Sequence, residues 1–222
     1  MPEAFQTLSK IVAKLVADLI REKPNACIGF PTGRTPRLCY EFLSESSRNG
    51  EIDWSGVRCF GLDEYVDAEE KHSFRHFLEE NLYSHTNLKA ENLYNPLFVD
   101  DYDRAIADAG GLDLCILGLG LNGHIAFNEP GTPLQSWTHS VLLTESTRQA
   151  NAEFFQGGRI PSRAVTMGLS TLLASRKIIL MVTGAAKKEI LSRAMRAKIS
   201  SEVPASFLQD HPELMVLADF DY

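Results

Sequence analysis

The distribution of apolar residues along the chain predicts helices that alternate with short strands. Between residues 3 and 22, apolar side chains recur at helical spacing, which predicts an amphipathic helix that ends at Pro24 and Asn25. Nearly continuous apolar runs of strand length follow, each bounded by glycine, proline or acidic residues. These predicted strands lie at 26–30, 57–62, 112–117, 177–183 and 215–218. Further helical patterns lie at 36–47, 73–83 and 185–197.

Strands that are apolar at successive positions are buried on both faces, because successive side chains point to opposite sides of a sheet. Their alternation with helices predicts an α/β fold, in which helices cover both faces of a mostly parallel, Rossmann-like sheet. The 222 residues contain no internal repeat, low-complexity tract or linker-like stretch, so we expect residues 1–222 to form a single domain. Ligands bind to such sheets outside the carboxyl ends of the strands, and the motifs described next lie at such ends.

The composition limits the class of partner. The net charge of −7 at pH 7 argues against binding to nucleic acid or to an anionic membrane surface. No apolar run approaches the roughly 20 residues that cross a bilayer. The first residues lack the pattern of a secretion signal, so we expect a cytoplasmic protein. An anionic ligand needs a local cationic pocket on such an acidic chain.

The cysteines are widely spaced and form no C-x-x-C pair. Most of them lie in predicted strands, so we interpret them as small buried side chains rather than as metal ligands or redox groups. They are Cys27, Cys39, Cys59 and Cys115.

A loop of sequence PTGRTP follows the first predicted strand. Gly33 permits a close backbone approach to a ligand, and Thr35 is a candidate helix cap with Pro36 in the first turn. The loop suits a phosphate dianion, because it offers the Arg34 guanidinium and two hydroxyl groups, on Thr32 and Thr35. The free N–H groups of a helix N-terminus add to these donors. The loop has neither the Walker pattern nor G-x-G-x-x-G, so a capped turn without a ligand is the alternative.

Two adjacent carboxylates, Asp63 and Glu64, end the second predicted strand in the segment GLDEY. At the carboxyl end of a parallel strand, one of them is a candidate general base that faces the cleft, while its neighbour pairs elsewhere. An acidic turn exposed to solvent is the alternative interpretation.

The stretch GLGLNGHIAFNEPG is the most informative motif. It places Asn122, His124, Asn128 and Glu129 among glycines and apolar residues, where hydrogen bonds strengthen and pKa values shift. A histidine oriented by a carboxylate is able to shuttle protons, although a lone histidine is more often structural. The remaining histidines show no cluster with metal-ligand spacing, so we expect no metal site.

Two further cationic residues are candidates for phosphate binding. Lys187 lies in the first turn of the helix predicted after the segment VTGAA, where a positive charge opposes the helix dipole unless an anion is bound. Arg163 precedes the segment AVTMG. The alternative interpretation of Lys187 is a lysine that is simply exposed to solvent.

Taken together, these segments resemble the glucosamine-6-phosphate deaminase family, which is grouped with the 6-phosphogluconolactonases. PTGRTP is similar to the family's phosphate loop, GLDEY to its L-D-E-Y segment, and GLGLNGHIAFNEPGT to its most characteristic stretch. AVTMGLSTLL, VTGAAK and VPASFLQDHP match later segments in the same order. The lactonases usually carry Asp-Glu-Arg where this chain has Asp63, Glu64 and Tyr65, and they lack the N-E-P continuation, so the resemblance favours the deaminase branch.

The resemblance implies isomerisation and deamination of glucosamine 6-phosphate, which gives fructose 6-phosphate and ammonia. It implies that Asp63 moves a proton between C2 and C1, that His124 opens the sugar ring, and that Glu129 orients His124. Asn122 is neutral at a position where some members have aspartate. The implied reaction has no redox step, so we expect no nicotinamide, flavin or other cofactor. The implied phosphate ligands are Thr32, Gly33, Arg34 and Lys187, with Thr35 and Arg163 as further candidates.

Several alternatives stay open at this point. GGLDLCILGLG and VPASFL also resemble members that act on galactosamine 6-phosphate and give tagatose 6-phosphate. Another alternative is lactonase activity on 6-phosphogluconolactone, which Tyr65 and Glu129 disfavour. The last is a non-catalytic sugar-phosphate-binding module.

Two expectations concern assembly and motion. Larger bacterial members are regulated hexamers that use cationic side chains soon after the N-E-P segment, and residues 132–141 contain no lysine or arginine. We therefore expect an unregulated monomer or small homo-oligomer. The polar stretch 144–163, which contains Gly157 and Gly158, is a candidate lid.

Overall fold

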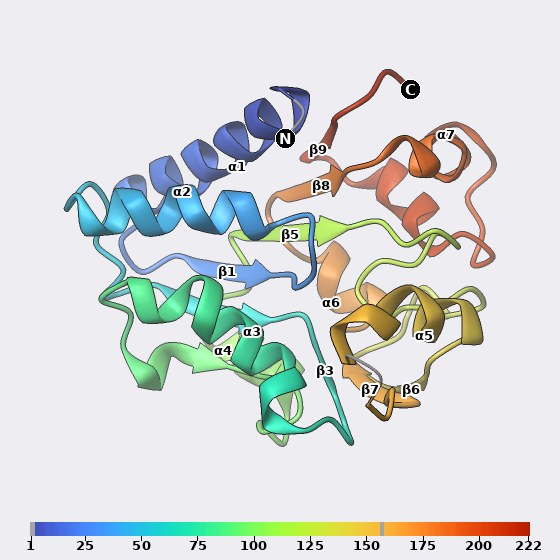
Figure 1. The fold of residues 1–222 in the computed structure, drawn as a ribbon, viewed down its shortest axis with the longest axis horizontal. Helices are drawn as coiled ribbons and strands as arrows, with labels where there is room; N and C mark the ends of the chain where they lie inside the picture. The colour runs from blue at the N-terminus through green and yellow to red at the C-terminus, as the bar shows by residue number, and fades with distance from the viewer. Residues whose placement is uncertain (1–2, 156–157) are drawn as a thin grey trace.

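The computed structural model describes residues 3–155 and 158–222, and its centre is a six-stranded sheet in the order β4-β2-β1-β5-β8-β9 (Figure 1). Every neighbouring pair of strands in this sheet is parallel, which confirms the predicted α/β fold. The strands are β1 (Cys27–Phe30), β2 (Arg58–Gly61), β4 (Leu93–Tyr94), β5 (Leu114–Gly118), β8 (Ile178–Val182) and β9 (Leu214–Ala218).

The strand order creates a crevice between β1 and β5. From β1 the chain runs outward to β2 and β4 on one side, and from β5 to β8 and β9 on the other. Ligands in open α/β sheets bind where the order reverses in this way, at the carboxyl ends of the two central strands. The loop PTGRTP follows β1 and residues 118–131 follow β5, so the fold brings the two loop motifs to one crevice.

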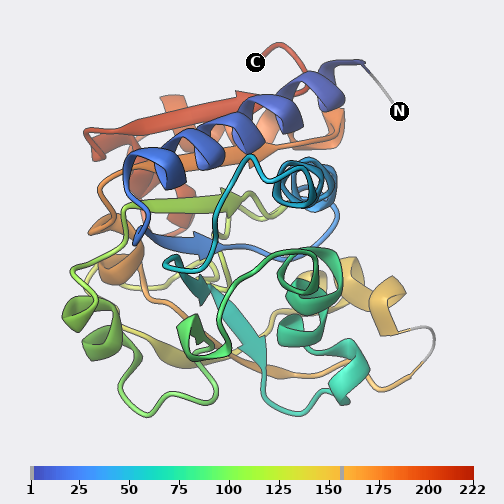
Figure 2. The same ribbon diagram turned by 90° about the vertical axis from the view of Figure 1, so that its left-hand side faces the viewer.

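Helices cover both faces of this sheet, as predicted (Figures 1 and 2). Successive side chains of β8 show why the strands are continuously apolar: Ile179 and Met181 lie in one core, and Ile178 and Leu180 lie in the other. The first core is closed by α1 (Glu3–Glu22), α2 (Arg37–Arg48) and α3 (Phe74–Asn81). The second is closed by α4 (Tyr102–Asp108), α6 (Leu169–Leu173) and α7 (Lys188–Arg196).

A second, antiparallel sheet adjoins the first, and the sequence analysis did not predict it. Its strands, in the order β3-β7-β6, are β3 (Asp63–Tyr65), β7 (Arg163–Thr166) and β6 (His139–Leu142). Since β2 ends at Gly61, the chain passes from the parallel to the antiparallel sheet within two residues. The remaining α-helix is α5 (Glu145–Asn151), and the short 3₁₀ helices are η1 (Glu70–His72), η2 (Tyr83–His85), η3 (Ala90–Asn92), η4 (Ala152–Phe155), η5 (Ala185–Lys187) and η6 (Pro204–Asp210).

Most predicted element boundaries are confirmed within a few residues. The predicted helix 185–197 begins as the 3₁₀ turn η5 before it becomes α7, and the predicted helix 73–83 is divided into α3 and η2. The cysteines are buried and reduced, as expected of small core side chains. In the described part of the chain, no helix has both the length and the apolar character needed to cross a membrane.

The carboxylate of Glu64 connects β3 to α3 and to the loop after β4. It is 1% exposed, and its two oxygens accept the backbone N–H groups of Tyr65, Phe74 and Arg75 at 2.8 to 2.9 Å. The side-chain amide of Asn95 donates to it as well, at 2.9 Å. The carboxylate therefore satisfies the first N–H groups of α3, as an N-terminal cap does.

We predict that Glu64→Gln lowers the free energy of unfolding by about 2 kcal/mol, because one oxygen that accepts from Arg75 and Asn95 becomes an amide that cannot accept. Denaturation with urea measures this change. Glu69→Gln is the matched control, since the Glu69–Lys71 ion pair has side chains that are 65% and 69% exposed and its loss changes stability by about 0.5 kcal/mol at most. Equal stability of the two variants would contradict the role of Glu64.

Candidate active site

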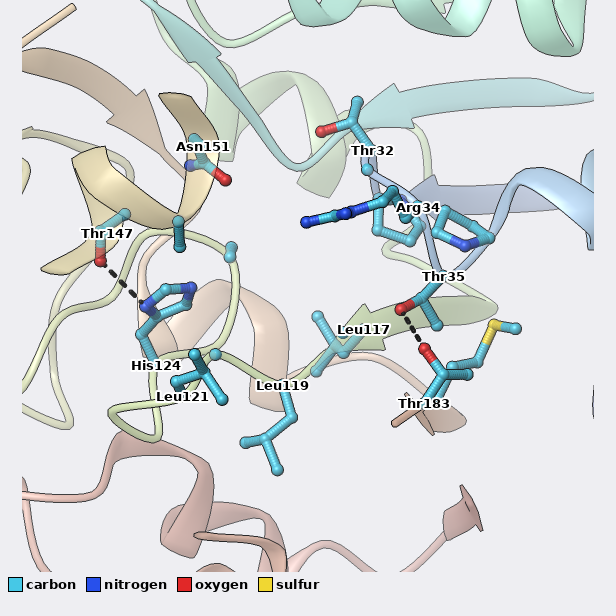
Figure 3. A pocket seen from close by; sticks show the side chains of 18 of the residues that line it. Thr32, Arg34, Thr35, Leu117, Leu119, Leu121, His124, Thr147, Asn151 and Thr183 are labelled. Atoms are coloured by element: carbon cyan, nitrogen blue, oxygen red, sulfur yellow. Dashed lines mark hydrogen bonds between the residues drawn. The ribbon is translucent and has the colours of Figure 1, made fainter. Parts of the chain in front are cut away.

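A cavity of about 370 Å³ lies at the carboxyl ends of the central strands (Figure 3). The loops after β1, β5 and β8, the junction of β2 and β3, and the α5–η4 segment all contribute to its wall. Its size and its position suit a small-molecule ligand. Several residues expected from the sequence line it together: Thr32, Gly33, Arg34, Thr35, Asp63, His124 and Lys187.

The loop after β1 forms one end of the cavity. Gly33 has φ of +98°, a conformation that favours glycine. The hydroxyl of Thr35 lies 2.8 Å from that of Thr183, so it joins this loop to the end of β8 (Figure 3). The expected helix cap at Thr35 is therefore wrong: Pro36 is the N-cap of α2, and no side chain in the described ranges caps that helix. An uncapped helix N-terminus beside a cavity suits an anion.

Two cationic side chains, Arg34 and Lys187, line this end of the cavity. Burial lowers the pKa of Lys187, the charge of Arg34 lowers it further, and Asp219 acts in the opposite direction. Arg34 Nη1 lies 3.0 Å from Glu153 Oε2, in an ion pair whose side chains are 70% and 77% exposed. Because exposed pairs of this kind contribute little to stability, an anionic ligand is able to replace Glu153 at the guanidinium.

The carboxyl group of Asp63 faces the cavity from the junction of β2 and β3. It is 7% exposed, and burial, followed by the charge of Glu64, raises its pKa to about 8. Asp63 lines the cavity, whereas Glu64 accepts backbone N–H groups of Tyr65 and Phe74. This agrees with the prediction that one carboxylate of the pair faces the cleft while the other pairs elsewhere. A carboxyl group with a pKa near neutrality is suited to act as a general base.

His124 lies across the cavity from Arg34, on the loop after β5 (Figure 3). Its Nδ1 is 3.7 Å from Glu129 Oε2 and 3.4 Å from Thr147 Oγ1. The ring also lies directly over Gly120: a Cβ atom at that position would come within 2.4 Å of the imidazole. The glycine therefore lets the ring lie flat against the loop, as close backbone approach requires.

Glu129 and Asn122 support His124 from outside the cavity wall. Asn122 Nδ2 donates to Glu129 Oε2 at 2.7 Å, and Asn122 Oδ1 accepts the backbone N–H of His124 at 3.2 Å. Burial raises the pKa of Glu129, but the His124 and Thr147 side chains beside it, the charge of His124 and the hydrogen bond from Asn122 outweigh burial and lower the pKa to about 2. Glu129 is thus ionised at neutral pH. Asn122 holds the carboxylate and the backbone rather than the imidazole ring.

Two more of the residues singled out in the sequence lie away from the cavity wall. Arg163 begins β7, and its guanidinium lies 3.8 Å from the Asp67 carboxylate. Asn128 is buried, and its amide donates to the backbone carbonyls of Ile125 and Met167, which fixes the loop that carries Glu129.

The sequence analysis missed several residues of the wall on the α5–η4 segment. Thr147 and Asn151 line the cavity one helical turn apart, and Phe154 follows them. The spacing of Thr147 and Asn151 by four residues, which places them on one helix face, is the signal that could have identified them. Within the candidate lid, the position of Gly157 lies outside the described residues.

The site shows no group of three or more metal-binding side chains in suitable positions among residues 3–155 and 158–222. Its polar groups are instead a buried carboxyl, an imidazole next to an ionised carboxylate, and two cations at the opposite end. The fold and the site thus define an α/β protein with an acid–base site for an anionic small molecule.

The chain belongs to the family of glucosamine-6-phosphate isomerases and 6-phosphogluconolactonases, whose model matches residues 2–216. It is 38% identical to a glucosamine-6-phosphate deaminase of Thermoanaerobacter pseudethanolicus, over 97% of this chain and 89% of that one. It is also 38% identical to a glucosamine-6-phosphate deaminase of Lachnoclostridium phytofermentans, over 98% of this chain and 97% of that one. Among solved structures, a monomeric glucosamine-6-phosphate deaminase is 35% identical with a TM-score of 0.92, over 96% of this chain and 93% of that one. The fold is shared by a 6-phosphogluconolactonase of Thermotoga maritima. That structure is 22% identical with a TM-score of 0.74, over 97% of this chain and 94% of that one.

We predict that Asp63→Asn stabilises the protein, and more so at pH 8 than at pH 4. The folded-state pKa of about 8 lies above the ordinary value of 3.8, so the folded protein binds more protons between these values. Its stability therefore falls as pH rises through this window, and an amide does not titrate. The melting temperature of the variant should exceed that of the wild type by about 4 °C at pH 8, with a much smaller difference at pH 4. A difference that is constant with pH would contradict the raised pKa.

Proposed function

We propose that this chain is a glucosamine-6-phosphate deaminase, which converts glucosamine 6-phosphate and water to fructose 6-phosphate and ammonia. The observation that carries the proposal is the set of groups that line one cavity: the Asp63 carboxyl with its raised pKa, the His124 imidazole, and the cations Arg34 and Lys187. The relatives named as glucosamine-6-phosphate deaminases, which align with nearly the whole chain, support it.

The first chemical step is opening of the sugar ring. His124 takes the proton of the C1 hydroxyl and returns it to the ring oxygen, so that the C1–O bond to the ring breaks and a free aldehyde forms. Glu129 remains ionised and stabilises the imidazolium that exists between the two transfers.

The second step moves a proton from C2 to C1. Asp63 takes the C2 proton, and its new carboxylic acid then protonates C1. The C1 oxygen gains a proton and the amino group loses one, which gives an enolamine on the way and leaves a C1 hydroxyl and an imine at C2. Water then adds to the imine carbon, and the C–N bond breaks to release ammonia. Atoms balance with one water consumed, and no electrons are transferred to or from a cofactor.

The phosphate group anchors the substrate at the far end of the cavity. Thr32, Gly33 and Thr35 are proposed to contact it from the loop after β1, together with the cations Arg34 and Lys187. Because the phosphate is fixed at one end, C1 and C2 are held near the proton-handling groups at the other, and such positioning supplies a large part of catalysis.

We also propose that residues 1–222 work as a single cytoplasmic domain, as a monomer or small homo-oligomer. The site takes Asp63 from the junction of the two sheets and its cations from the loops of the parallel sheet, so neither part holds it alone. The monomeric state of the solved deaminase supports the proposal on assembly.

We predict that the wild type releases ammonia from glucosamine 6-phosphate, and that Asp63→Asn lowers kcat at least about 10³-fold with little change in KM, because the amide cannot accept a proton. A coupled ammonia assay measures both constants. Galactosamine 6-phosphate and 6-phosphogluconolactone are assayed in parallel. Faster release from the galactosamine substrate would change the sugar but keep the mechanism, whereas hydrolysis of the lactone without ammonia from either sugar would overturn the proposal.

We further predict that kcat/KM rises with pH and levels off above about pH 8, since this constant reports the free enzyme and Asp63 must lose its proton to act as the base. The ionisations of the free substrate, measured by NMR titration, are first divided out. His124→Gln serves as the control, because it should lower the rate but keep the same ascending limb. A profile that is flat between pH 6 and pH 9 would exclude a base with this pKa.

A further inference from the structure

His124 needs support on its ring nitrogen Nδ1 that Glu129 alone does not give. The distance between His124 Nδ1 and Glu129 Oε2 is 3.7 Å, which exceeds hydrogen-bond length. Thr147 Oγ1 is closer to Nδ1, at 3.4 Å, and comes from a different element, the first turn of α5 (Figure 3). Thr147 is 3% exposed, so its side chain is largely shielded from bulk water.

The groups around His124 Nδ1 determine whether this nitrogen carries a proton. The hydroxyl of Thr144 donates to Thr147 Oγ1 at 3.0 Å. The carboxylate oxygen Oε2 of Glu129 lies on the same side of the ring, 3.7 Å from His124 Nδ1. A carboxylate only accepts, so the groups that face it must offer protons. His124 Nδ1 faces this carboxylate, so it carries the proton, and Thr147 Oγ1 is placed to accept it at 3.4 Å.

This arrangement selects one form of the neutral imidazole. With the proton on Nδ1, facing Thr147 and Glu129, the other nitrogen Nε2 keeps its lone pair. Nε2 lies on the side of the ring away from Thr147 (Figure 3), and His124 lines the cavity. That is the form able to take the proton of a C1 hydroxyl in the first step of ring opening.

We propose that Thr147 is a positioning residue for the ring-opening step: its hydroxyl holds the His124 ring with the proton on Nδ1 and the basic Nε2 toward the substrate. The effect of Thr147 on catalysis rests on the proposed function. The orientation of the His124 ring does not, because it is a property of the protein without substrate. Gly120 supports the flat side of the same ring, and Thr147 fixes its edge.

The test compares Thr147→Val, which keeps the shape and removes the hydroxyl, with Thr147→Ser, which keeps the hydroxyl. We expect kcat for ammonia release to fall about 10-fold or more in the valine variant, KM to stay within about twofold, and serine to restore most of kcat. Ser146→Ala is the matched control, since Ser146 is exposed in the same turn and its hydroxyl contacts Thr144 rather than His124. An acyclic amino-alditol 6-phosphate, which has no ring to open, should bind equally to wild type and valine variant.

A second measurement separates this inference from the proposed function. In ¹⁵N-histidine-labelled protein without substrate, with His124→Gln used to assign the signal, the wild-type ring should carry its proton on Nδ1, and the valine variant should show a mixture of the two forms. Unchanged kcat in the valine variant, failure of serine to restore it, or the same ring form in both proteins would overturn the inference. If the wild type releases no ammonia, the proposed function fails, and the NMR result still decides whether Thr147 orients the ring.

Discussion

The buried carboxylate of Glu64 fixes the point where the chain leaves the parallel sheet, and the geometry of the cavity depends on that point. It is held by the backbone N–H groups of Tyr65, Phe74 and Arg75 and by Asn95. Adjacent side chains of a strand point to opposite faces, so a firmly held Glu64 turns Asp63 the other way, toward the cavity. A one-residue shift of β3 would exchange the two carboxylates. The structural carboxylate thus determines which of the pair is available for chemistry.

Charge is distributed unevenly over an otherwise acidic chain. The net charge is −7, yet Arg34 and Lys187 lie together at one end of the cavity, close enough for Arg34 to lower the pKa of Lys187. Two neighbouring cations repel each other, and an anion between them removes that repulsion. The same chain therefore repels anions in general through its net charge and attracts them at one place. This is the local cationic pocket that an anionic ligand requires.

The sequence predicted the parallel sheet because its strands are buried on both faces, and it predicted the loops because ligand sites follow such strands. It did not predict the antiparallel sheet, since β3 consists of Asp63, Glu64 and Tyr65, a polar run without a strand pattern, and pairs with residues 163–166, about a hundred positions away. Thr35 was wrongly expected to cap a helix because its real partner, Thr183, is 148 positions away in sequence. Thr147 was missed because its contact joins α5 to the loop that carries His124, 23 positions earlier, and only the folded chain brings them together.

Two carboxyl groups of the site, Asp63 and Glu129, have nearly the same burial by exposed fraction, at 7% and 5%, but opposite protonation. Asn122 donates to Glu129, His124 and Thr147 lower its pKa further, and that pKa is about 2. Burial and the charge of Glu64 act on Asp63 without such compensation from the described residues, and its pKa is about 8. Environments that push the pKa values of like groups apart assign them different tasks. Glu129 keeps a fixed negative charge beside the imidazole, whereas Asp63 is able to gain and lose a proton near neutral pH. Because no group among the described residues compensates the burial of Asp63, its ionised form costs stability, which an amide at this position would restore.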